Sequence, residues 1–317
     1  MKAKGKGLFK IFFRAAVSLG LLFWLFQRVN IEEVLSSFST IAASVWLSAM
    51  VLYLTSQVLS SIRWFMLARA LDFGGRFLTY LKYYFVGMFF NLFLPSAIGG
   101  DVLKAFFLSR GGNSKLRATY SILLDRLFGL WAMFVLGAFA AIFSPEVLPY
   151  RFRIILLASA LAMTLFVAFM PFFQKLVRLL FPVFSGRFAC VFLTLKRPSS
   201  LISAFLLSLM LQFCGMYAVY LLSQGLGLAC PATFYFAVFP MVAILTILPI
   251  SLSGLGIREG GFVYFLGLKH IPPEKAIAVS LSFFAVQAAT ALIGGVGYLA
   301  GAHKVTVINS TNRDEDA

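Results

Sequence analysis

Long apolar runs, separated by short polar segments, follow one another along the whole chain. Six of them are long enough to cross a membrane as an α-helix, which needs about 20 residues for a hydrocarbon core of roughly 30 Å. These six runs cover residues 8–27, 41–62, 118–143, 154–173, 199–223 and 276–300. The pattern predicts an all-α polytopic membrane protein with about six full transmembrane helices.

Two further stretches are apolar but are interrupted by a proline. The interruptions are Pro95, between runs 77–94 and 95–109, and Pro249, between runs 233–248 and 249–267. Proline breaks a helix, and the second run of each pair is too short to cross the bilayer comfortably. Each pair is therefore expected to form a re-entrant hairpin of two half-helices, with the helix break at the proline.

The composition agrees with a chain embedded in the membrane. Hydrophobic residues make up 61% of the 317 positions and charged residues 12%, whereas a soluble domain has about 25% charged residues. Short segments of alternating hydrophobicity, typical of a transmembrane β-barrel, are absent. We expect a single transmembrane domain over residues 1–304, followed by a short polar tail over 305–317 that is cytoplasmic and disordered.

The net charge of +16 comes from Lys and Arg that lie mostly in short segments between apolar runs. This distribution orients helices by the positive-inside rule, and it also attracts anionic lipid head groups. Membrane lipids are therefore the expected partners, and nucleic acid is not. The segment with Arg63, Arg69 and Arg76 is assigned to the cytoplasm. Run 8–27 has no clear cleavage site and is interpreted as a first membrane helix. The protein is expected to lie in the cell (inner, cytoplasmic) membrane, with its N- and C-termini both in the cytoplasm.

The cysteines and histidines do not form a recognisable site. Cys190, Cys214 and Cys230 lack metal-ligand spacing, and the two histidines, His270 and His303, are far apart. No metal, no cofactor and no catalytic residue are therefore expected. Asn91, Gln212 and Gln287 are polar residues within apolar runs, and we interpret them as interhelical hydrogen-bond partners.

The two hairpin turns resemble each other. The first reads LPSAIGGDVLK from Leu94, and the second reads LPISLSGLGIRE from Leu248. Each contains Leu-Pro, a serine, two glycines and a charged pair. In the topology above they enter from opposite faces, which is the inverted-repeat architecture of many transporters. Chance recurrence of Gly and Pro is the alternative explanation.

The hairpin turns also supply the candidate binding residues. Non-helical backbone at membrane depth must be lined by protein or water, and the N-terminus of a half-helix can hold a phosphate where glycine allows close approach. The alternative is that these glycines only permit tight packing. The candidates for binding a lipid phosphate are Ser96, Gly99, Gly100, Asp101, Lys104, Arg126, Ser251, Gly254, Gly256 and Arg258.

Ionisable residues in apolar runs are costly and therefore suggest function. Arg258 is the strongest candidate because a guanidinium suits bidentate phosphate binding. Asp125 and Glu259 are assigned to charge pairing or proton coupling. Arg126 is expected to pair with Asp101, and Arg258 with Asp125 or Glu259. A purely structural ion-pair network remains the alternative.

Three stretches together resemble a known family. They are NLFLPSAIGGDVLKAFFLSR, LLDRLFGL and LPISLSGLGIREGG. In these stretches the chain is similar to the lysylphosphatidylglycerol synthase transmembrane-domain family, also described as flippase-like, over about residues 8 to 302. Lys104 departs from the arginine common in that family. The resemblance implies lipid movement across a bilayer. Two-domain members append a catalytic domain that attaches lysine to phosphatidylglycerol, and that activity is not expected here.

The function expected from these features is a transporter or flippase for an anionic or phosphate-bearing lipid, such as a phospholipid or a polyprenyl phosphate. One alternative is a membrane-embedded enzyme that acts on a lipid phosphate, for example by glycosyl transfer. Another is a non-transporting partner of envelope-biosynthesis enzymes. We expect the transporter rather than an enzyme, and the sequence favours no oligomeric state.

Overall fold

The computed structural model describes residues 15–25, 27, 29–93, 99–110, 114–180, 198–247, 251 and 254–299. Within these residues every element is a helix, which confirms the predicted all-α fold. A helix over Ala15–Leu25 precedes α2 (Ile31–Thr40), α3 (Ala43–Ala70), α4 (Phe77–Phe93), α5 (Gly99–Ser109), α6 (Lys115–Phe143), η1 (Pro145–Val147), α7 (Tyr150–Leu180), α10 (Pro198–Gly225), α11 (Ala232–Ile247), α12 (Ile257–Gly267) and α13 (Pro273–Gly297).

Five of the described helices are long and apolar enough to cross a membrane, namely α3, α6, α7, α10 and α13. They correspond to five of the six predicted spans. The sixth, run 8–27, is represented by the short helix Ala15–Leu25, and its first residues lie outside the described part of the chain. The polytopic membrane fold is therefore confirmed.

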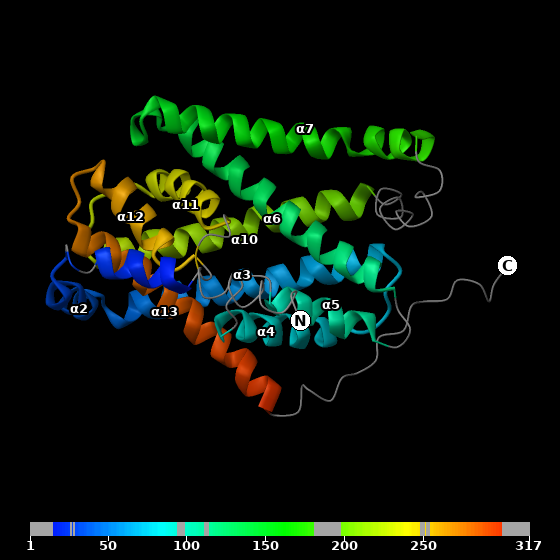
Figure 1. Ribbon diagram of the computed structural model, residues 1–317, viewed down its shortest axis with the longest axis horizontal. Helices are drawn as coiled ribbons and strands as arrows, with labels where there is room; N and C mark the ends of the chain where they lie inside the picture. The colour runs from blue at the N-terminus through cyan, green and yellow to red at the C-terminus, as the bar shows by residue number, and fades with distance from the viewer. Residues whose placement is uncertain are drawn as a thin grey trace.

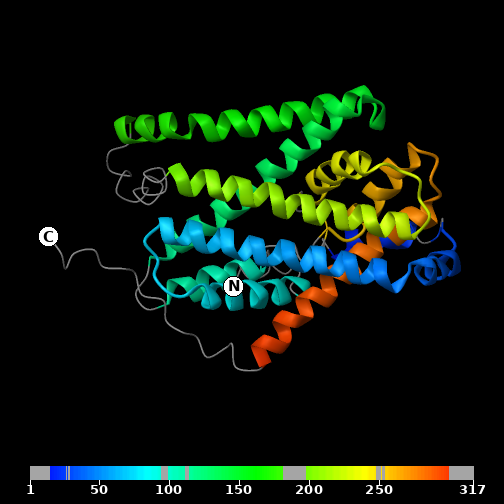
Figure 2. The same cartoon turned by 180° about the vertical axis from the view of Figure 1, so that it is seen from behind.

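The two predicted hairpins are present as packed pairs of short helices. Helix α4 packs against α5, and α11 packs against α12. Both prolines lie outside the described residues, but each falls between the end of one short helix and the start of the next. Helices α3 and α10 lie side by side and run in opposite directions (Figures 1 and 2). Because each hairpin follows one of these two helices, the hairpins start from opposite ends of the bundle.

The helices of the two halves correspond one to one. Helices α3 to α6 have 28, 17, 11 and 29 residues, and α10 to α13 have 28, 16, 11 and 25. The contacts correspond as well: α6 packs on its own hairpin through α5 and on the other through α11, while α13 packs on α12 and α4. The expected inverted repeat therefore extends over four helices in each half.

Glycines let the long helices cross the opposite hairpin closely. Gly294 of α13 lies against the backbone of Phe85 in α4, and Gly137 of α6 lies against Pro240 in α11. Apolar burial drives little association between helices in lipid, so small residues that allow close backbone approach become important. These two crossings are equivalent in the two halves, and they fix each hairpin between helices of both.

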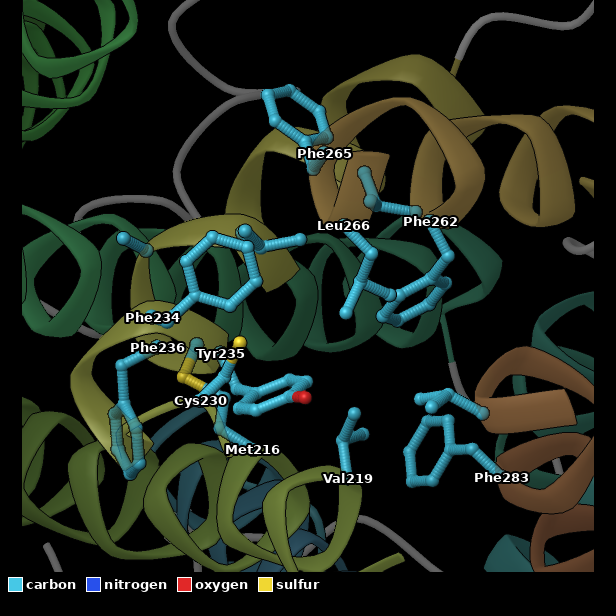
Figure 3. Close-up of a cluster of buried hydrophobic side chains, with 14 of the residues drawn as sticks. Met216, Val219, Cys230, Phe234, Tyr235, Phe236, Phe262, Phe265, Leu266 and Phe283 are labelled. Atoms are coloured by element: carbon cyan, nitrogen blue, oxygen red, sulfur yellow. The ribbon is translucent and has the colours of Figure 1, made fainter. Parts of the chain in front are cut away.

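Aromatic side chains fill the space around the second hairpin. Figure 3 shows a buried cluster that combines Phe234, Tyr235 and Phe236 of α11 with Phe262 and Phe265 of α12 and with Met216 and Val219 of α10. Helix α7, in contrast, lies along the outside of the bundle (Figure 1), and many of its large apolar side chains are exposed. The protein core therefore lies between the hairpins and the four long helices α3, α6, α10 and α13.

Candidate functional site

Asp101 is the centre of a charge cluster at the first hairpin. It is the third residue of α5, and only 6% of it is exposed. The Nε and Nη2 atoms of Arg126 each lie 2.8 Å from Asp101 Oδ2, and Lys104 Nζ lies 3.3 Å from Asp101 Oδ1. The structure thus brings together Asp101 and Arg126, the pair expected from the sequence, and adds Lys104 as a second cation.

The start of α5 is held by a side chain from α4. The backbone N–H of Gly100 donates a 2.6 Å hydrogen bond to Asn91 Oδ1, so Asn91 is the interhelical partner that its position suggested. A side chain on Gly100 would collide with the carbonyl group of Gly87. This helix start therefore fits the packing alternative: the glycine allows close helix contact, and its N–H is already occupied.

Glu259 is the equivalent acid in the second half, because it is the third residue of α12. It is fully buried, and its Oε2 accepts a 2.7 Å hydrogen bond from the backbone N–H of Gly256. Arg258 Nη2 lies 2.8 Å from Glu259 Oε1, and Ser280 Oγ donates to the same oxygen at 3.0 Å. Of the two partners considered for Arg258, the structure selects Glu259. Gly254 and Gly256 have φ of 80° and 82°, which favours glycine at both positions.

Asp125 pairs instead with Arg63, which was wrongly expected to lie in a segment between helices. Helix α3 extends to Ala70, so Arg63 lies inside the helix and is 3% exposed. Its Nε lies 2.7 Å from Asp125 Oδ1, its Nη1 donates to Ser208 Oγ at 2.7 Å and its Nη2 to Ser60 Oγ at 3.3 Å. This pair joins α3, α6 and α10.

A polar stripe along α3 would have indicated Arg63 from the sequence. Tyr53, Ser56, Ser60 and Arg63 are spaced three, four and three residues apart, which places them on one face of a helix. The apolar run ends at residue 62 only because the run is cut at the first charge. The stripe was missed because the serines and the tyrosine do not interrupt an apolar run.

Helix α3 connects the three charge clusters. The Tyr84 hydroxyl donates to Ser60 Oγ at 2.8 Å, and Lys104 Nζ lies 3.8 Å from the centre of the Tyr84 ring. Tyr53, two turns before Ser60, interacts electrostatically with both Arg126 and Arg258. Charged groups from the two hairpins therefore approach the same part of α3.

The comparison with known families agrees with this architecture. The model of the family described as lysylphosphatidylglycerol synthase TM region matches residues 11–295. The chain belongs to this family. No curated protein matches the chain. Membership places the protein among membrane proteins of lipid metabolism or flippase type, and it confirms the resemblance carried by the three motifs.

In this family member the positive and negative charges of the three clusters, taken together, do not balance. Arg63, Lys104, Arg126 and Arg258 carry four positive charges, and Asp101, Asp125 and Glu259 carry three negative ones. The Arg63 and Arg258 pairs are neutral, so the surplus belongs to the Asp101 cluster. There the Lys104 side chain is 6% exposed and the Arg126 side chain 54%. Arg126 is thus the accessible cation.

The remaining predicted positions contribute less to the description of the site. Pro95, Ser96 and Pro249 lie outside the described residues, and Gly99 is the first residue of α5. Ser251 is 7% exposed, and its hydroxyl has no hydrogen-bond partner among the residues that the structure describes. Within the described part of the chain, His, Cys, Asp and Glu side chains do not gather in groups of three or more that could hold a metal.

Proposed function

We propose that this protein is a transporter of flippase type that moves an anionic, phosphate-bearing lipid across the cell membrane. The observation that carries the proposal is the surplus positive charge at Arg126, which is half exposed beside the first hairpin. The substrate class is a phospholipid or a polyprenyl phosphate, since both offer phosphate oxygens at the end of an apolar chain.

The electrostatics of the site favour an anionic ligand. An unbalanced charge at membrane depth costs about 2.5–3.5 kcal/mol on insertion scales, and a bound phosphate group would remove that cost. Arg126 uses Nε and Nη2 for Asp101, and Nη1 has no hydrogen bond among the described residues. The free edge of a guanidinium is well suited to bind phosphate oxygens.

The inverted repeat supports movement rather than binding alone. Transporters with this architecture hold the substrate between repeats and expose it alternately to the two sides. In this chain the hairpins start from opposite ends, and Arg126 of α6 and Arg258 of α12 both interact electrostatically with Tyr53 of α3. A head group at Arg126 would lie on α6, the helix that packs on both hairpins through α5 and α11.

The orientation follows from the positive-inside rule. Basic residues gather at the end of the bundle where α3 leads into α4 and α5 leads into α6: Arg69, Arg76, Lys82, Arg110, Lys115 and Arg117. The opposite end carries both acidic and basic residues. The acidic residues are Glu32, Glu33, Glu146 and Glu274, and the basic residues include Arg151, Arg153, Lys269 and Lys275. We assign the first end to the cytoplasm, with the N- and C-termini on the same side.

The test is a translocation assay in liposomes with purified protein. Short-chain fluorescent phosphatidylglycerol, a polyprenyl phosphate and fluorescent phosphatidylcholine are compared, for wild type, Arg126→Ala and the control Arg151→Ala, whose side chain is exposed at the start of α7. We expect wild type and Arg151→Ala to move at least one anionic lipid, and Arg126→Ala to be slower by tenfold or more.

Two results would contradict the proposal. One is wild-type protein that moves no anionic lipid faster than empty liposomes do. The other is Arg126→Ala that inserts normally and transports at the wild-type rate. Chemically altered lipid recovered from the vesicles would instead favour an enzyme that acts on a lipid phosphate.

A further inference from the structure

Lys104 of α5 is buried against α3 and α4. Its side chain is 6% exposed, and its stem lies against Gly87 of α4, where an added Cβ would be 3.0 Å from Lys104 Cε. The ammonium lies 3.8 Å from the centre of the Tyr84 ring and 5.8 Å from the centre of the Trp64 ring. An aromatic face attracts a cation more strongly when the cation is removed from water. The position of Lys104 is therefore set by contacts within the protein.

The two aromatic rings beside Lys104 are held in place by hydrogen bonds. The Tyr84 hydroxyl donates to Ser60 Oγ at 2.8 Å, and Trp64 Nε1 donates to Ser121 Oγ at 3.2 Å. These bonds connect α4 to α3 and α3 to α6. Because this arrangement buries the ammonium, the charge of Lys104 acts on its surroundings through the acid next to it.

The two oxygens of that acid, Asp101, have different partners. Arg126 places Nε and Nη2 each 2.8 Å from Oδ2. Oδ1 accepts no hydrogen bond from the described residues, and its ionic contact is Lys104 Nζ at 3.3 Å. Lys104 follows Asp101 by three residues in α5, so these two residues move together with that helix. The acid therefore has one cation from its own helix and one from α6.

The pair of Asp101 and Lys104 is neutral without Arg126. A buried acid that loses its only partner is strongly unfavourable, and Lys104 prevents this when Arg126 turns towards another anion. Glu259 and Arg258 form the corresponding pair within α12, so each half-helix carries a neutral pair of its own. Arg126 is then the cation that neither pair needs.

We propose that Lys104 is a positioning residue that neutralises Asp101 and so allows Arg126 to exchange this carboxylate for the phosphate of a bound lipid. This inference rests on the proposed function, because it takes the head group to bind at Arg126. Lys104 does not contact the phosphate; it weakens the hold of Asp101 on Arg126 by sharing the charge of the acid. The three side chains together carry one surplus positive charge with Lys104 and none without it.

The experiment measures binding of water-soluble dihexanoyl phosphatidylglycerol to the full-length protein in detergent by titration calorimetry. Lys104→Met removes the ammonium and keeps a long apolar stem, and Lys115→Met makes the same change at an exposed lysine at the start of α6. Without Lys104 the phosphate must compete with a carboxylate that has no other cation. A hydrogen bond to a charged group corresponds to about tenfold or more in affinity, so we expect Lys104→Met to bind at least tenfold more weakly and Lys115→Met to bind like wild type.

A second substitution separates positioning from direct contact with the lipid. Asp101→Asn/Lys104→Met restores the surplus charge without restoring the ammonium, and we expect it to bind within about threefold of wild type. Equally weak binding by this double variant and by Lys104→Met would mean that Lys104 contacts the phosphate or is only structural, and the inference would be wrong. Asp101→Asn alone is expected to bind at least as tightly as wild type, since the competing carboxylate is gone; weaker binding would also overturn the inference.

Arg126→Ala distinguishes failure of the inference from failure of the proposed function. If wild type does not bind the lipid, or if Arg126→Ala binds it as tightly as wild type, the proposed function fails. If Arg126→Ala weakens binding and Lys104→Met does not, the inference about Lys104 is wrong and the proposed function stands.

The pairing of Lys104 with Asp101 is also tested without lipid, by unfolding in mixed micelles. Arg126→Ala keeps the neutral pair, whereas Arg126→Ala/Lys104→Met leaves Asp101 buried without a cation. We expect the ratio of folded to unfolded protein to be about 100-fold lower in the double variant than in Arg126→Ala. Equal stability of these two variants would show that Lys104 does not neutralise Asp101.

Discussion

Arg63 and Asp125 allow a direct test of whether a buried ion pair stabilises this fold. Their side chains are 4% and 7% exposed, and Arg63 Nε lies 2.7 Å from Asp125 Oδ1. Asp125→Leu removes the anion and leaves the guanidinium with its hydrogen bonds to Ser208 and Ser60. The perturbation therefore creates a buried charge that is hydrogen-bonded but no longer paired.

The expected cost follows from this geometry. Removing one partner of a buried pair costs about 3–5 kcal/mol, and the two serine hydrogen bonds that remain place Asp125→Leu near the lower end. A loss of about 3 kcal/mol corresponds to roughly a 100-fold fall in the ratio of folded to unfolded protein. The double variant Arg63→Met/Asp125→Leu has no buried charge, and we expect it to lie within about 1 kcal/mol of wild type.

The measurement is the free energy of unfolding in mixed micelles as the fraction of denaturing detergent is increased. The four proteins of the cycle are wild type, the two single variants and the double variant, with Arg151→Met as a control for loss of an exposed arginine. Each single variant leaves one buried charge without its partner and the double variant leaves none, so a coupling of about 5 kcal/mol is expected between Arg63 and Asp125. A double variant as unstable as the sum of both single variants, or an Asp125→Leu variant as stable as wild type, would refute the reasoning.

Two other regions give separate predictions. Gly100→Ala should destabilise the protein by about 1–3 kcal/mol, since the new methyl group would overlap the Gly87 carbonyl; Gly260→Ala, which meets no atom within 4 Å, should be neutral or slightly stabilising in the same unfolding assay. Burial raises the pKa of the Cys230 thiol in the connection between α10 and α11, and the thiolate is the reactive form. In a Cys190→Ser/Cys214→Ser variant we therefore expect maleimide modification of Cys230 at pH 7.5, followed by mass spectrometry, to be at least about tenfold slower in the folded protein than after unfolding. Equal rates would contradict the burial.

The transmembrane fold could be predicted because hydrophobicity and helix length respond to the bilayer in a simple way. A run such as 118–143 has no stable alternative to a spanning helix, since every backbone group must be bonded internally. The hairpins were predictable for the opposite reason: runs 95–109 and 249–267 are too short to span. The repeat of two short motifs likewise indicated a duplication that the structure extends to four helices in each half.

The pairing of charges was only partly predictable. The acid at Asp101 and the arginine at Arg126 lie in consecutive helices, and their opposite charges suggested the contact. Arg63 and Asp125 are 62 residues apart, and their contact depends on how α3 packs against α6. The end of a helix also cannot be placed from hydropathy alone when the helix continues past its first charged residue, as α3 does after residue 62. The charge of Arg63 was visible in the sequence, but its burial between α3, α6 and α10 was not.

The two halves share their backbone plan but hold their acids differently. Asp101 and Glu259 occupy the same position, the third residue of a half-helix, where the helix dipole favours an acid. Glu259 is paired with the residue directly before it in the same helix, so that ion pair moves as a unit with α12. Asp101 is held by Arg126 from α6, so that ion pair fixes the position of α5 relative to another helix. Any rearrangement that separates the first hairpin from α6 must replace this contact, and a phosphate at Arg126 is a group able to do so.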